Sequence, residues 1–595
     1  MIREIRNIVA LLRGRLNMWI IPLMIAAGVL SSLAEGVGIT LFIPLLQNVH
    51  GNAHIDTGSR VIDFLANLFD AIPREHRVVT ICALIFAAIL TRAVLLYANE
   101  ILYGWVGARV NHRLRSDIFR QLCAVSFRFI ERNQSGELLN ALSTESWRAC
   151  EAVAMLIYFV ISICTLMIYT TLLLLISWKM TLVVAVAMFV ISRITRVIAR
   201  RSKIIGEKIT RANAALSDRM VEGFYGMKLI HSFGHEAHEQ RRFDYASREV
   251  SGLFFKQGVT QGAINPIYEI CAGTLLVAIM FNALHDPAQL SALLVFIFVL
   301  YRLQPRIQAV DGARTGLGAL STSVNEVRTL LDPAGKPFVV SGNRPYGALN
   351  NAIRFENITF RYDEPDKPAL RNVSLSIPAG KTTALVGPSG AGKSTLINLI
   401  FRFYDPSSGE IFLDDQPLRS FQLDAWRSRI ALVSQDVHMF NTTVRDNIAY
   451  GRLDATHDEI VAAAKLADAH EFIIQLPNGY DTAVGDRGVR LSGGQKQRIT
   501  LARAIVRNPE ILILDEATNA LDSISEHLIQ EALDMLSKDR TVIVIAHRLS
   551  TVEQADHIIV LEEGRVAEEG DLDRLLKNEG LFARLYKLQN RGALV

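Results

Sequence analysis

The stretch GPSGAGKST, from Gly387 to Thr395, combines residue types and a spacing that suit the binding of phosphate groups. It follows the apolar run TTALVG and precedes LINLIFRFY, which predicts a buried strand that gives way to a helix at this point. Glycines at this spacing let backbone N–H groups surround an anion, and the N-terminus of the helix adds positive potential. We expect Lys393 to reach the terminal phosphates of a nucleotide and the Ser394 hydroxyl to ligate Mg²⁺. The candidate phosphate-binding residues of this loop are Gly387, Ser389, Gly390, Gly392, Lys393, Ser394 and Thr395.

Two adjacent carboxylates end the apolar segment ILILDEA, which has the pattern of a buried strand. Asp515 is placed to hold Mg²⁺, directly or through water, and Glu516 is placed to polarise an attacking water as a general base. His547 ends a second such segment, TVIVIAH, and can contact the γ-phosphate side of the same water. An isolated carboxylate pair or histidine is more often structural, but these positions at strand ends beside a phosphate loop favour catalysis.

A second glycine turn, LSGGQ at residues 491–495, opens a long helical pattern. Ser492 and the backbone N–H groups of Gly493 and Gly494 can bind an anion at the positive end of that helix. The turn lies about twenty residues before ILILDEA. It is therefore a second phosphate site, although one bound nucleotide does not need two.

Strand-like and helical patterns alternate around these motifs over residues 350–595. Segments such as ILILD and TVIVIA are apolar throughout, as expected for strands that are covered on both faces of a sheet. Residues 331–349 are rich in Pro and Gly, which is the composition of a domain boundary. We predict an α/β P-loop nucleotide-binding domain over 350–595 and a linker over 331–349. The strand-like runs are IRFENITFRY, LRNVSLSI, TTALVG, GEIFLD, IALVSQ, ILILDEA, TVIVIAH and HIIVLEEG.

Residues 1–330 differ, because apolar runs long enough to cross a bilayer recur along them, and about 20 residues suffice for one span. The chain has 595 residues, 50% of them hydrophobic, which fits more than one domain and a membrane region. We predict an α-helical membrane domain of six long transmembrane helices over 1–330. The spans are expected at Met18–Leu46, Val78–Tyr103, Val153–Ser177, Met180–Ile198, Ile264–Leu284 and Leu290–Leu303, the last being the shortest.

Basic residues set the orientation of these spans. They gather between spans two and three and between spans four and five, so both segments should be cytoplasmic. Within them, residues 126–142 and 215–233 are expected to form short crossing helices, which we call elbows. The first sixteen residues have the pattern of an amphipathic helix on the membrane surface.

Ionisable residues interrupt the predicted spans at Glu35, Arg92, Glu100, Glu269 and Arg302. A charge that faces lipid is costly, so each should face the bundle interior, water or a partner. Lining of a substrate cavity and a structural ion pair are equally compatible with the sequence.

The net charge of +4 does not decide for or against nucleic acid. The five cysteines form no C-x-x-C pair that would indicate a disulfide framework or a zinc site.

The motifs occur in an order that resembles the ATP-binding cassette (ABC) transporters. They are GPSGAGKST, the glutamine of VSQD, LSGGQ, ILILDE, the aspartate of NALD and the histidine of IAHR. With its fused six-span half, the chain is similar to exporter-type half-transporters, a group that includes lipid A flippases and multidrug and peptide exporters. The resemblance covers nearly the whole chain, and its motifs are most specific over residues 350–580.

The resemblance also implies roles for single residues. Tyr362 would stack on adenine, Gln435 would complete the Mg²⁺ shell and sense the membrane half, and Asp522 would communicate across a dimer. The segment Ser492–Gln495 would close on ATP bound to a second subunit, which accounts for the extra phosphate site. The catalytic residues implied are Glu516, His547 and Gln435; the metal ligands are Ser394, Gln435 and Asp515; the remaining nucleotide contacts are Tyr362, the loop Gly387–Thr395, Ser492, Gly493, Gly494, Gln495 and Asp522.

The expected function is ATP-driven export or flipping of an amphipathic lipid, lipid-linked saccharide, peptide or drug by a homodimer with alternating access. An importer built on the same scaffold, as in siderophore-type uptake, would share every motif, and the direction of transport distinguishes the two. A soluble cassette ATPase acting on nucleic acid would lack the six spans, and a purely regulatory channel would not need Glu516 and His547.

The expected cofactors are ATP and Mg²⁺, and the expected partners are a second copy, membrane lipid and the substrate, without nucleic acid. The expected location is the bacterial inner membrane, with the ATPase domain in the cytoplasm.

Overall fold

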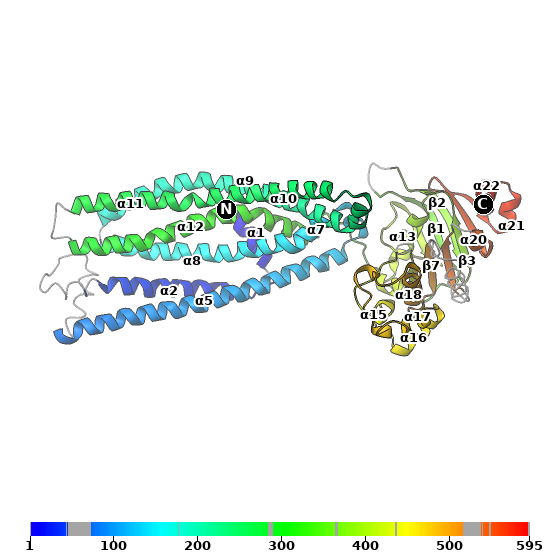
Figure 1. Cartoon of the computed structure of the whole chain (residues 1–595), viewed down its shortest axis with the longest axis horizontal. Helices are drawn as coiled ribbons and strands as arrows, with labels where there is room; N and C mark the ends of the chain where they lie inside the picture. Colours follow the sequence, from blue (N-terminus) through cyan, green and yellow to red (C-terminus); the bar gives the residue numbers. More distant parts are fainter. Residues whose placement is uncertain are drawn as a thin grey trace. The chain divides into compact units, whose positions relative to one another are not determined.

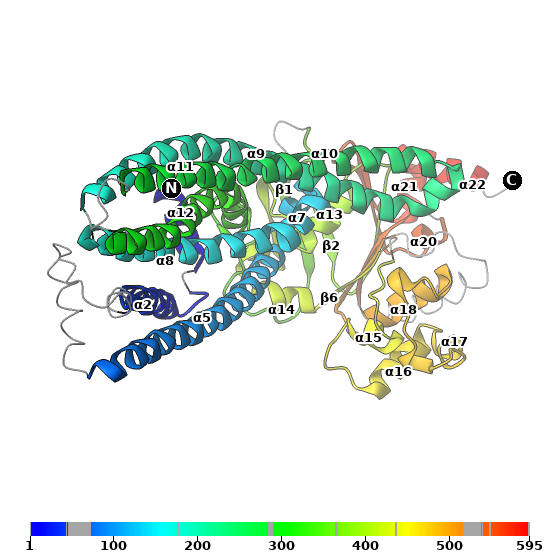
Figure 2. The same cartoon turned by 60° about the vertical axis from the view of Figure 1, so that its left-hand side comes forward.

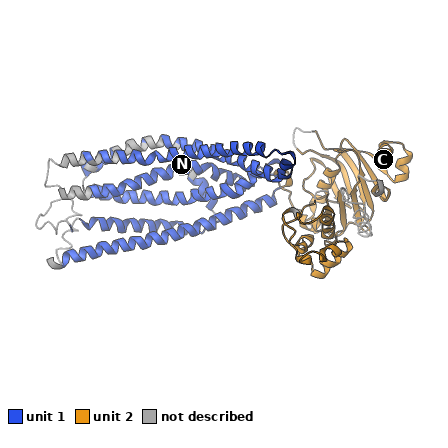
Figure 3. Ribbon diagram, viewed as in Figure 1, with its two compact units in different colours: residues 1–125, 130–336 blue, residues 126–129, 337–595 orange. Residues whose placement is uncertain are grey.

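The computed structural model describes residues 2–12, 14–42, 45, 73–176, 178–283, 290–362, 367–434, 437–515, 537, 540–546 and 549–592. The chain divides into two compact units (Figure 3). The helical unit comprises Met1–Val125 and Ile130–Lys336, and the sheet unit comprises Ser126–Phe129 and Pro337–Val595. The division after Lys336 falls within the Pro- and Gly-rich residues 331–349.

Long helices make up the helical unit. They are α1 (Ile2–Leu12), α2 (Ile20–Thr40), α5 (Arg74–Ala124), α6 (Phe127–Arg132), α7 (Ser135–Asn140), the π-helix η1 (Ala141–Glu145), α8 (Ser146–Ile176), α9 (Trp178–Phe233), α10 (Glu236–Gly262), α11 (Ile264–Ala283) and α12 (Leu290–Leu331). At 1.5 Å per residue, α9 is about 84 Å long and exceeds the thickness of any bilayer. Figures 1 and 2 show α9 and α10 side by side, and α12 lies against α8 and α9.

Each of the six predicted spans overlaps one of these helices, namely α2, α5, α8, α9, α11 and α12, which confirms the predicted helical character. Within the described residues, three helical stretches are long and apolar enough to cross a membrane: Ile20–Thr40, His76–Ala124 and Ser135–Leu175. Helix α12 contains Pro305 and continues without a break to Leu331. The predicted end of the sixth span at Leu303 is therefore not the end of its helix.

The two predicted elbows differ from each other. The first breaks into α6, α7 and η1, as expected for a short crossing segment. The second is wrong, because α9 runs on through Phe233 and the chain turns only at Gly234, whose φ is 63°. Gly223 and Gly226 lie inside that helix without a left-handed backbone, and glycine interrupts a helix only weakly when nothing else ends it.

The start of the first elbow packs as part of the sheet unit. The Ser126 backbone N–H donates to the Pro337 carbonyl at 2.9 Å. The Phe127 ring lies 5.7 Å from the Phe403 ring and 6.5 Å from the Tyr404 ring, measured between centroids. Four residues that come from the membrane half of the sequence, Ser126–Phe129, thus belong to the fold of the other half.

Two sheets form the centre of the sheet unit (Figure 1). The antiparallel sheet has the order β2-β1-β4-β5, and the larger sheet has the order β10-β9-β3-β8-β7-β6. In the larger sheet all neighbouring strands are parallel except β10, which pairs antiparallel with β9. The strands are β1 (Ala352–Phe360), β2 (Leu370–Pro378), β3 (Thr382–Val386), β4 (Ser408–Leu413), β5 (Gln416–Pro417), β6 (Ile430–Val433), β7 (Ile511–Asp515), β8 (Thr541–Ile545), β9 (His557–Glu562) and β10 (Arg565–Gly570).

Strand β7 shows why the central strands are apolar throughout. Ile511 and Ile513 join the hydrophobic core on one face of the larger sheet, and Leu512 and Leu514 join the core on the other face. Successive side chains of a strand point to opposite faces, so a strand covered on both faces cannot alternate with polar residues. All eight predicted strands are confirmed. Two further strands were missed: β5 has only two residues, and β10 has three charged residues in its sequence, RVAEEG, and lies at a sheet edge.

The helices of the sheet unit connect and cover these strands. They are α13 (Lys393–Ile400), α14 (Leu423–Ser428), α15 (Val444–Ala449), α16 (His457–Leu466), α17 (His470–Ile474), α18 (Gly493–Val506), α20 (Leu549–Glu553), α21 (Leu572–Lys577) and α22 (Leu581–Gly592), with short 3-10 turns at Leu418–Ser420, Gly479–Asp481 and Asp486–Gly488. Residues of α15 to α18 share one core with β6, β7 and β8. The α/β fold predicted for this half is confirmed.

Candidate functional site

The phosphate loop lies between β3 and α13, at the strand-to-helix transition that the sequence predicts. Gly390 and Gly392 have φ values of 79° and 104°, which side chains rarely tolerate. Gly387 approaches another strand so closely that an added Cβ would lie 2.2 Å from the Leu561 carbonyl oxygen. Glycine is therefore required here both for the backbone conformation and for the close packing of the loop.

Lys393 and Tyr362 lie beside this loop. The buried Lys393 ammonium donates to the carbonyls of Gly387 at 2.6 Å and Pro388 at 3.1 Å, so it lies over the loop itself. The Tyr362 hydroxyl lies 3.1 Å from Thr395 Oγ1, which ties the aromatic residue to the first turn of α13. Ser394, on the same turn, is exposed. The structure thus brings Tyr362, Lys393, Ser394 and Thr395 to one region.

The other candidate groups follow the strands beside β3. In the larger sheet β8 lies between β3 and β7, and Asp515 at the end of β7 is opposite Ile545 at the end of β8. Parallel strands end at the same edge of a sheet, so the half-buried Asp515 and the loop after β3 share that edge. Gln435, Glu516, Asp522 and His547 lie outside the described residues.

The LSGGQ turn starts α18 with a capping box. Ser492 Oγ accepts a hydrogen bond from the Gln495 backbone N–H at 3.2 Å, and the Gln495 side chain accepts one from the Ser492 N–H at 2.9 Å. Ser492 and Gly493 are exposed and Gly494 is half-buried. The N-terminus of this 14-residue helix therefore faces outward, with its conformation fixed by its own side chains.

This arrangement can bind a nucleoside triphosphate. The glycine loop and the start of α13 supply backbone donors, Lys393 supplies a positive charge, and the positive end of the helix attracts phosphate. The exposed Ser394 hydroxyl and the Asp515 carboxylate are oxygen ligands of the kind that Mg²⁺ prefers. The residues present therefore fit ATP with its metal ion.

A second concentration of charge lies inside the helical unit. Glu35, on α2, has a side chain only 6% exposed and is surrounded by three guanidinium groups. Its carboxylate oxygens lie 3.2 Å from Arg92 on α5, 3.3 Å from Arg302 and 3.5 Å from Arg306, both on α12. We call these four residues the arginine cluster. Three positive charges thus face one negative charge.

Sequence reasoning identified three members of the arginine cluster but missed Arg306. The signal was present, because Arg302 and Arg306 are four residues apart and project from the same face of a helix. Arg306 contacts Glu35 on α2 although it lies beyond the predicted end of the sixth span at Leu303. Glu100 and Glu269 are exposed on α5 and α11 and take no part in the cluster.

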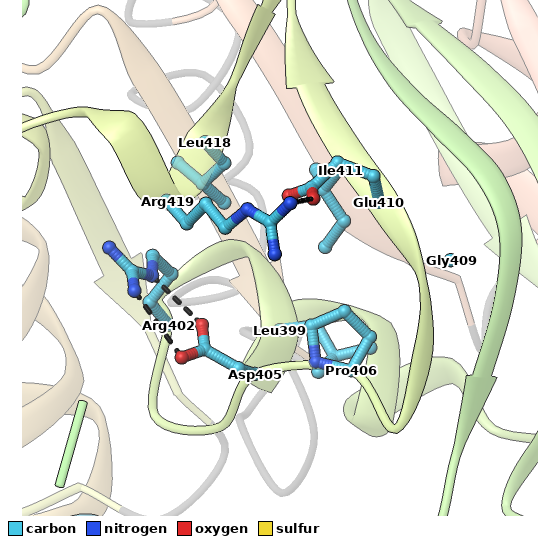
Figure 4. A pocket seen from close by; sticks show the side chains of 9 residues that line it. All are labelled: Leu399, Arg402, Asp405, Pro406, Gly409, Glu410, Ile411, Leu418 and Arg419. Atoms are coloured by element: carbon cyan, nitrogen blue, oxygen red, sulfur yellow. Dashed lines mark hydrogen bonds and ion pairs between the residues drawn. The ribbon is translucent and has the colours of Figure 1, made fainter. Parts of the chain in front are cut away.

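A small pocket elsewhere in the sheet unit is lined by charges that neutralise one another (Figure 4). Arg402 is almost fully buried, and its Nε lies 3.0 Å from Asp405. Arg419 and Glu410, across the pocket, are 2.7 Å apart. Arg402 also donates to the Val340 carbonyl at 3.0 Å, so these groups hold the chain in place and leave no charge for a ligand.

A helical unit that spans a membrane, joined to a unit with a phosphate loop at the edge of a parallel sheet, defines an ATP-driven membrane transporter. The ABC transporter family matches residues 370–519, and the ABC transporter transmembrane region matches residues 18–304. The chain belongs to the ABC transporter family. It is an ATP-hydrolysing, multi-pass exporter.

Individual relatives agree with this assignment. The heterocyst differentiation ATP-binding protein HepA of Nostoc sp. is 38% identical over 93% of this chain and 91% of that protein. The ATP-dependent lipid A-core flippase of Haemophilus influenzae is 35% identical over 96% of this chain and 95% of that protein. A solved structure of a bacterial Atm1-family ABC exporter with ATP bound has 29% identity and a TM-score of 0.81, covering 98% of this chain and 99% of that one.

Proposed function

We propose that this exporter moves an amphiphile with an anionic headgroup, such as a phosphorylated lipid, and that the arginine cluster binds that headgroup. The observation that carries the proposal is the ratio of charges at Glu35. One carboxylate compensates one of three guanidinium groups, which leaves an excess of two positive charges among the described residues of the cluster. Unpaired charges inside a membrane domain are costly, and they mark substrate paths.

The cluster also has hydrogen-bonding capacity to spare. Among the described residues of the cluster, the Arg92 Nε donor is buried without a hydrogen-bond partner that satisfies both distance and angle. Guanidinium groups present several N–H donors in a fixed plane, and they bind phosphate and carboxylate oxygens in pairs. An anionic headgroup would satisfy donors that Glu35 alone does not.

Apolar rings adjoin the charged groups. The Arg302 guanidinium lies 5.8 Å from the centre of the Phe298 ring, and that ring lies 5.7 Å from the Phe42 ring. Both rings are partly exposed. A charged region that continues into aromatic surface fits a substrate with a polar head and an apolar tail, which agrees with the lipid substrate in the name of the Haemophilus relative.

The active form in this proposal is a homodimer in the bacterial inner membrane, with its sheet units in the cytoplasm. Each chain has one phosphate loop and one LSGGQ turn, and pairing two copies would place the turn of each chain against the ATP of the other. Mg²⁺ would be held by Ser394, Gln435 and Asp515, and Glu516 would act as general base with His547 beside it. Because both Glu516 and His547 are present in every chain, a homodimer would have two competent sites.

The test compares amphiphiles that share one acyl chain and differ in the headgroup. The purified protein is reconstituted in vesicles, and ATP hydrolysis and ATP-dependent movement are measured with phosphate, phosphocholine and ammonium headgroups. We expect the phosphate amphiphile to half-stimulate hydrolysis at a concentration about tenfold lower than the others, which corresponds to one favourable charged contact. Equal stimulation by the ammonium amphiphile would reject the anionic substrate class, and movement toward the ATP side would indicate import.

A further inference from the structure

One arginine of the sheet unit connects the helix that begins at LSGGQ with the chain that follows Gln435. Arg503 lies on α18, ten residues after Gly493. Its Nε donates to the Asn447 carbonyl at 2.8 Å, its Nη1 donates to the His438 carbonyl at 3.0 Å, and its Nη2 donates to Asn447 Oδ1 at 3.0 Å. A single planar group thus binds two separate segments of chain.

Aromatic rings enclose this guanidinium. The Arg503 charge lies 5.9 Å from the centres of both the Phe440 and the Tyr450 rings, and these two rings are 4.4 Å apart. Burial lowers the pKa of Arg503. Contacts between a guanidinium and aromatic faces gain strength as water is excluded, so the group is held firmly.

Asn447 continues the connection from Arg503 to the segment 438–443. This side chain is fully buried on α15 and uses both ends of its amide. Its Oδ1 accepts from the Phe440 N–H at 3.0 Å, and its Nδ2 donates to the carbonyls of Phe440 and Thr443, each at 3.0 Å. The segment is therefore held at several backbone atoms by one residue, which Arg503 in turn holds.

We propose that Arg503 and Asn447 form a positioning link that makes the LSGGQ helix and the chain leading from Gln435 move as one body. The proposal rests on the proposed function, in which LSGGQ contacts ATP of the partner copy and Gln435 contributes to the metal ion. A change at either end then reaches the other through a contiguous set of hydrogen bonds, without contact between Arg503 and the nucleotide. Arg503 is a positioning residue and not a catalytic one.

The chain offers a matched control in Arg507. This arginine caps the same helix α18 and is likewise half-buried, and its guanidinium donates to the carbonyls of Gly451, at 2.9 Å, and Arg427. Burial lowers the pKa of Arg507 as it does for Arg503. Among the described contacts, Arg507 makes no hydrogen bond to the segment 438–443. Arg503→Lys and Arg507→Lys therefore each remove a guanidinium group that donates to two carbonyls, and only the first substitution breaks the proposed link.

Two variants break the link at opposite ends. Arg503→Lys loses the guanidinium group that donates to both His438 and Asn447. Asn447→Asp keeps an acceptor for Arg503 but loses the Nδ2 donor to the segment. We expect both to lower the basal kcat of the full-length reconstituted protein about tenfold, to leave the KM for ATP within about twofold, and to abolish stimulation by the amphiphile, because small misplacements of catalytic groups lower rates strongly. Arg507→Lys should keep kcat, KM and stimulation near wild type.

Thermal unfolding of the three variants separates positioning from stability. If Arg503→Lys and Arg507→Lys lose kcat in proportion to their loss in Tm, the link is only structural and the proposal is overturned. The same conclusion follows if Arg503→Lys changes KM and kcat equally. Should Arg503→Lys fail to fold, Asn447→Asp gives the same kcat and KM comparison. If no anionic amphiphile stimulates the wild-type protein, the proposed substrate class fails, while the basal kcat and KM of the variants still test the link.

Discussion

The phosphate loop and the arginine cluster both present N–H donors and positive charge, but the chain assembles them in opposite ways. The loop takes all its groups from nine consecutive residues, and its backbone does much of the binding. The arginine cluster takes four side chains from three helices, separated by up to 271 positions between Glu35 and Arg306. The first site can be recognised from a motif, whereas the second exists only after the helices pack. Chemistry common to a family can therefore be read from the sequence more easily than the substrate of one member.

The largest expected effect tests the nucleotide site that contains the phosphate loop. Replacing Glu516 by Gln removes the proposed general base while preserving the size of the side chain, and general-base catalysis contributes about 10²–10⁴-fold to rates. We expect hydrolysis to fall by that range while ATP still binds. Release of phosphate measures the first quantity and retention of labelled ATP on the purified protein measures the second. Hydrolysis at the wild-type rate would remove Glu516 from its assigned role.

A smaller effect is expected for the arginine cluster. Replacing Arg92 or Arg306 by Gln should raise the concentration of anionic amphiphile needed for half-stimulation about tenfold, which corresponds to loss of one charged contact. Basal hydrolysis should stay near wild type because the phosphate loop is untouched. Arg314→Gln is the control, since Arg314 lies two turns further along α12 and faces Asp311 at 4.0 Å. Equal shifts in Arg306→Gln and Arg314→Gln would show that the cluster has no special role.

The smallest expected effect concerns a third group of charges, at the far end of α12. Burial, together with the nearby carboxylates of Glu145 and Glu137, raises the pKa of Glu326 to about 7, and Arg148 opposes that shift. The native state therefore binds more protons than the unfolded state between about pH 4.5 and pH 7, and the contribution of Glu326 to stability falls as pH rises through this range.

Glu326→Gln should remove that dependence. We expect the variant to be more stable than wild type above pH 7 and indistinguishable from it below about pH 4.5, where Glu326 is protonated in both states. Unfolding temperatures of the full chain in detergent at several pH values measure the difference. A parallel shift at every pH would mean that Glu326 does not titrate in this range.

The sequence predicted features that depend on neighbouring residues. The strands, the loop Gly387–Thr395 and the helix start at Ser492 follow from local apolar patterns and from glycine turns that precede a helical pattern. It did not predict that α9 continues through Phe233, because two glycines within a helical pattern do not say whether the helix breaks. Nor could it place Ser126–Phe129 in the sheet unit, since the packing of Phe127 on Phe403 joins residues nearly 280 positions apart.

The same limit applies to the arginine cluster. The sequence shows Glu35 and Arg302 as separate charges in the first and sixth predicted spans, and nothing in either span indicates that the two meet. Their side chains lie 3.3 Å apart in the structure, and α12 continues to Leu331, well beyond its apolar run. Hydropathy marks where a helix is apolar, but it does not mark where the helix ends.

Pro305 stands between the two arginines that α12 gives to Glu35. Proline has no N–H, so the Tyr301 carbonyl, four residues earlier, loses its usual hydrogen-bond donor. The backbone hydrogen bonding of α12 is therefore interrupted at this point. Bending of α12 at this point would change the distance between the Arg302 and Arg306 side chains, because they lie on either side of Pro305. If the arginine cluster binds an anion as proposed, the curvature of α12 at Pro305 would set how well Arg302 and Arg306 can bind it together.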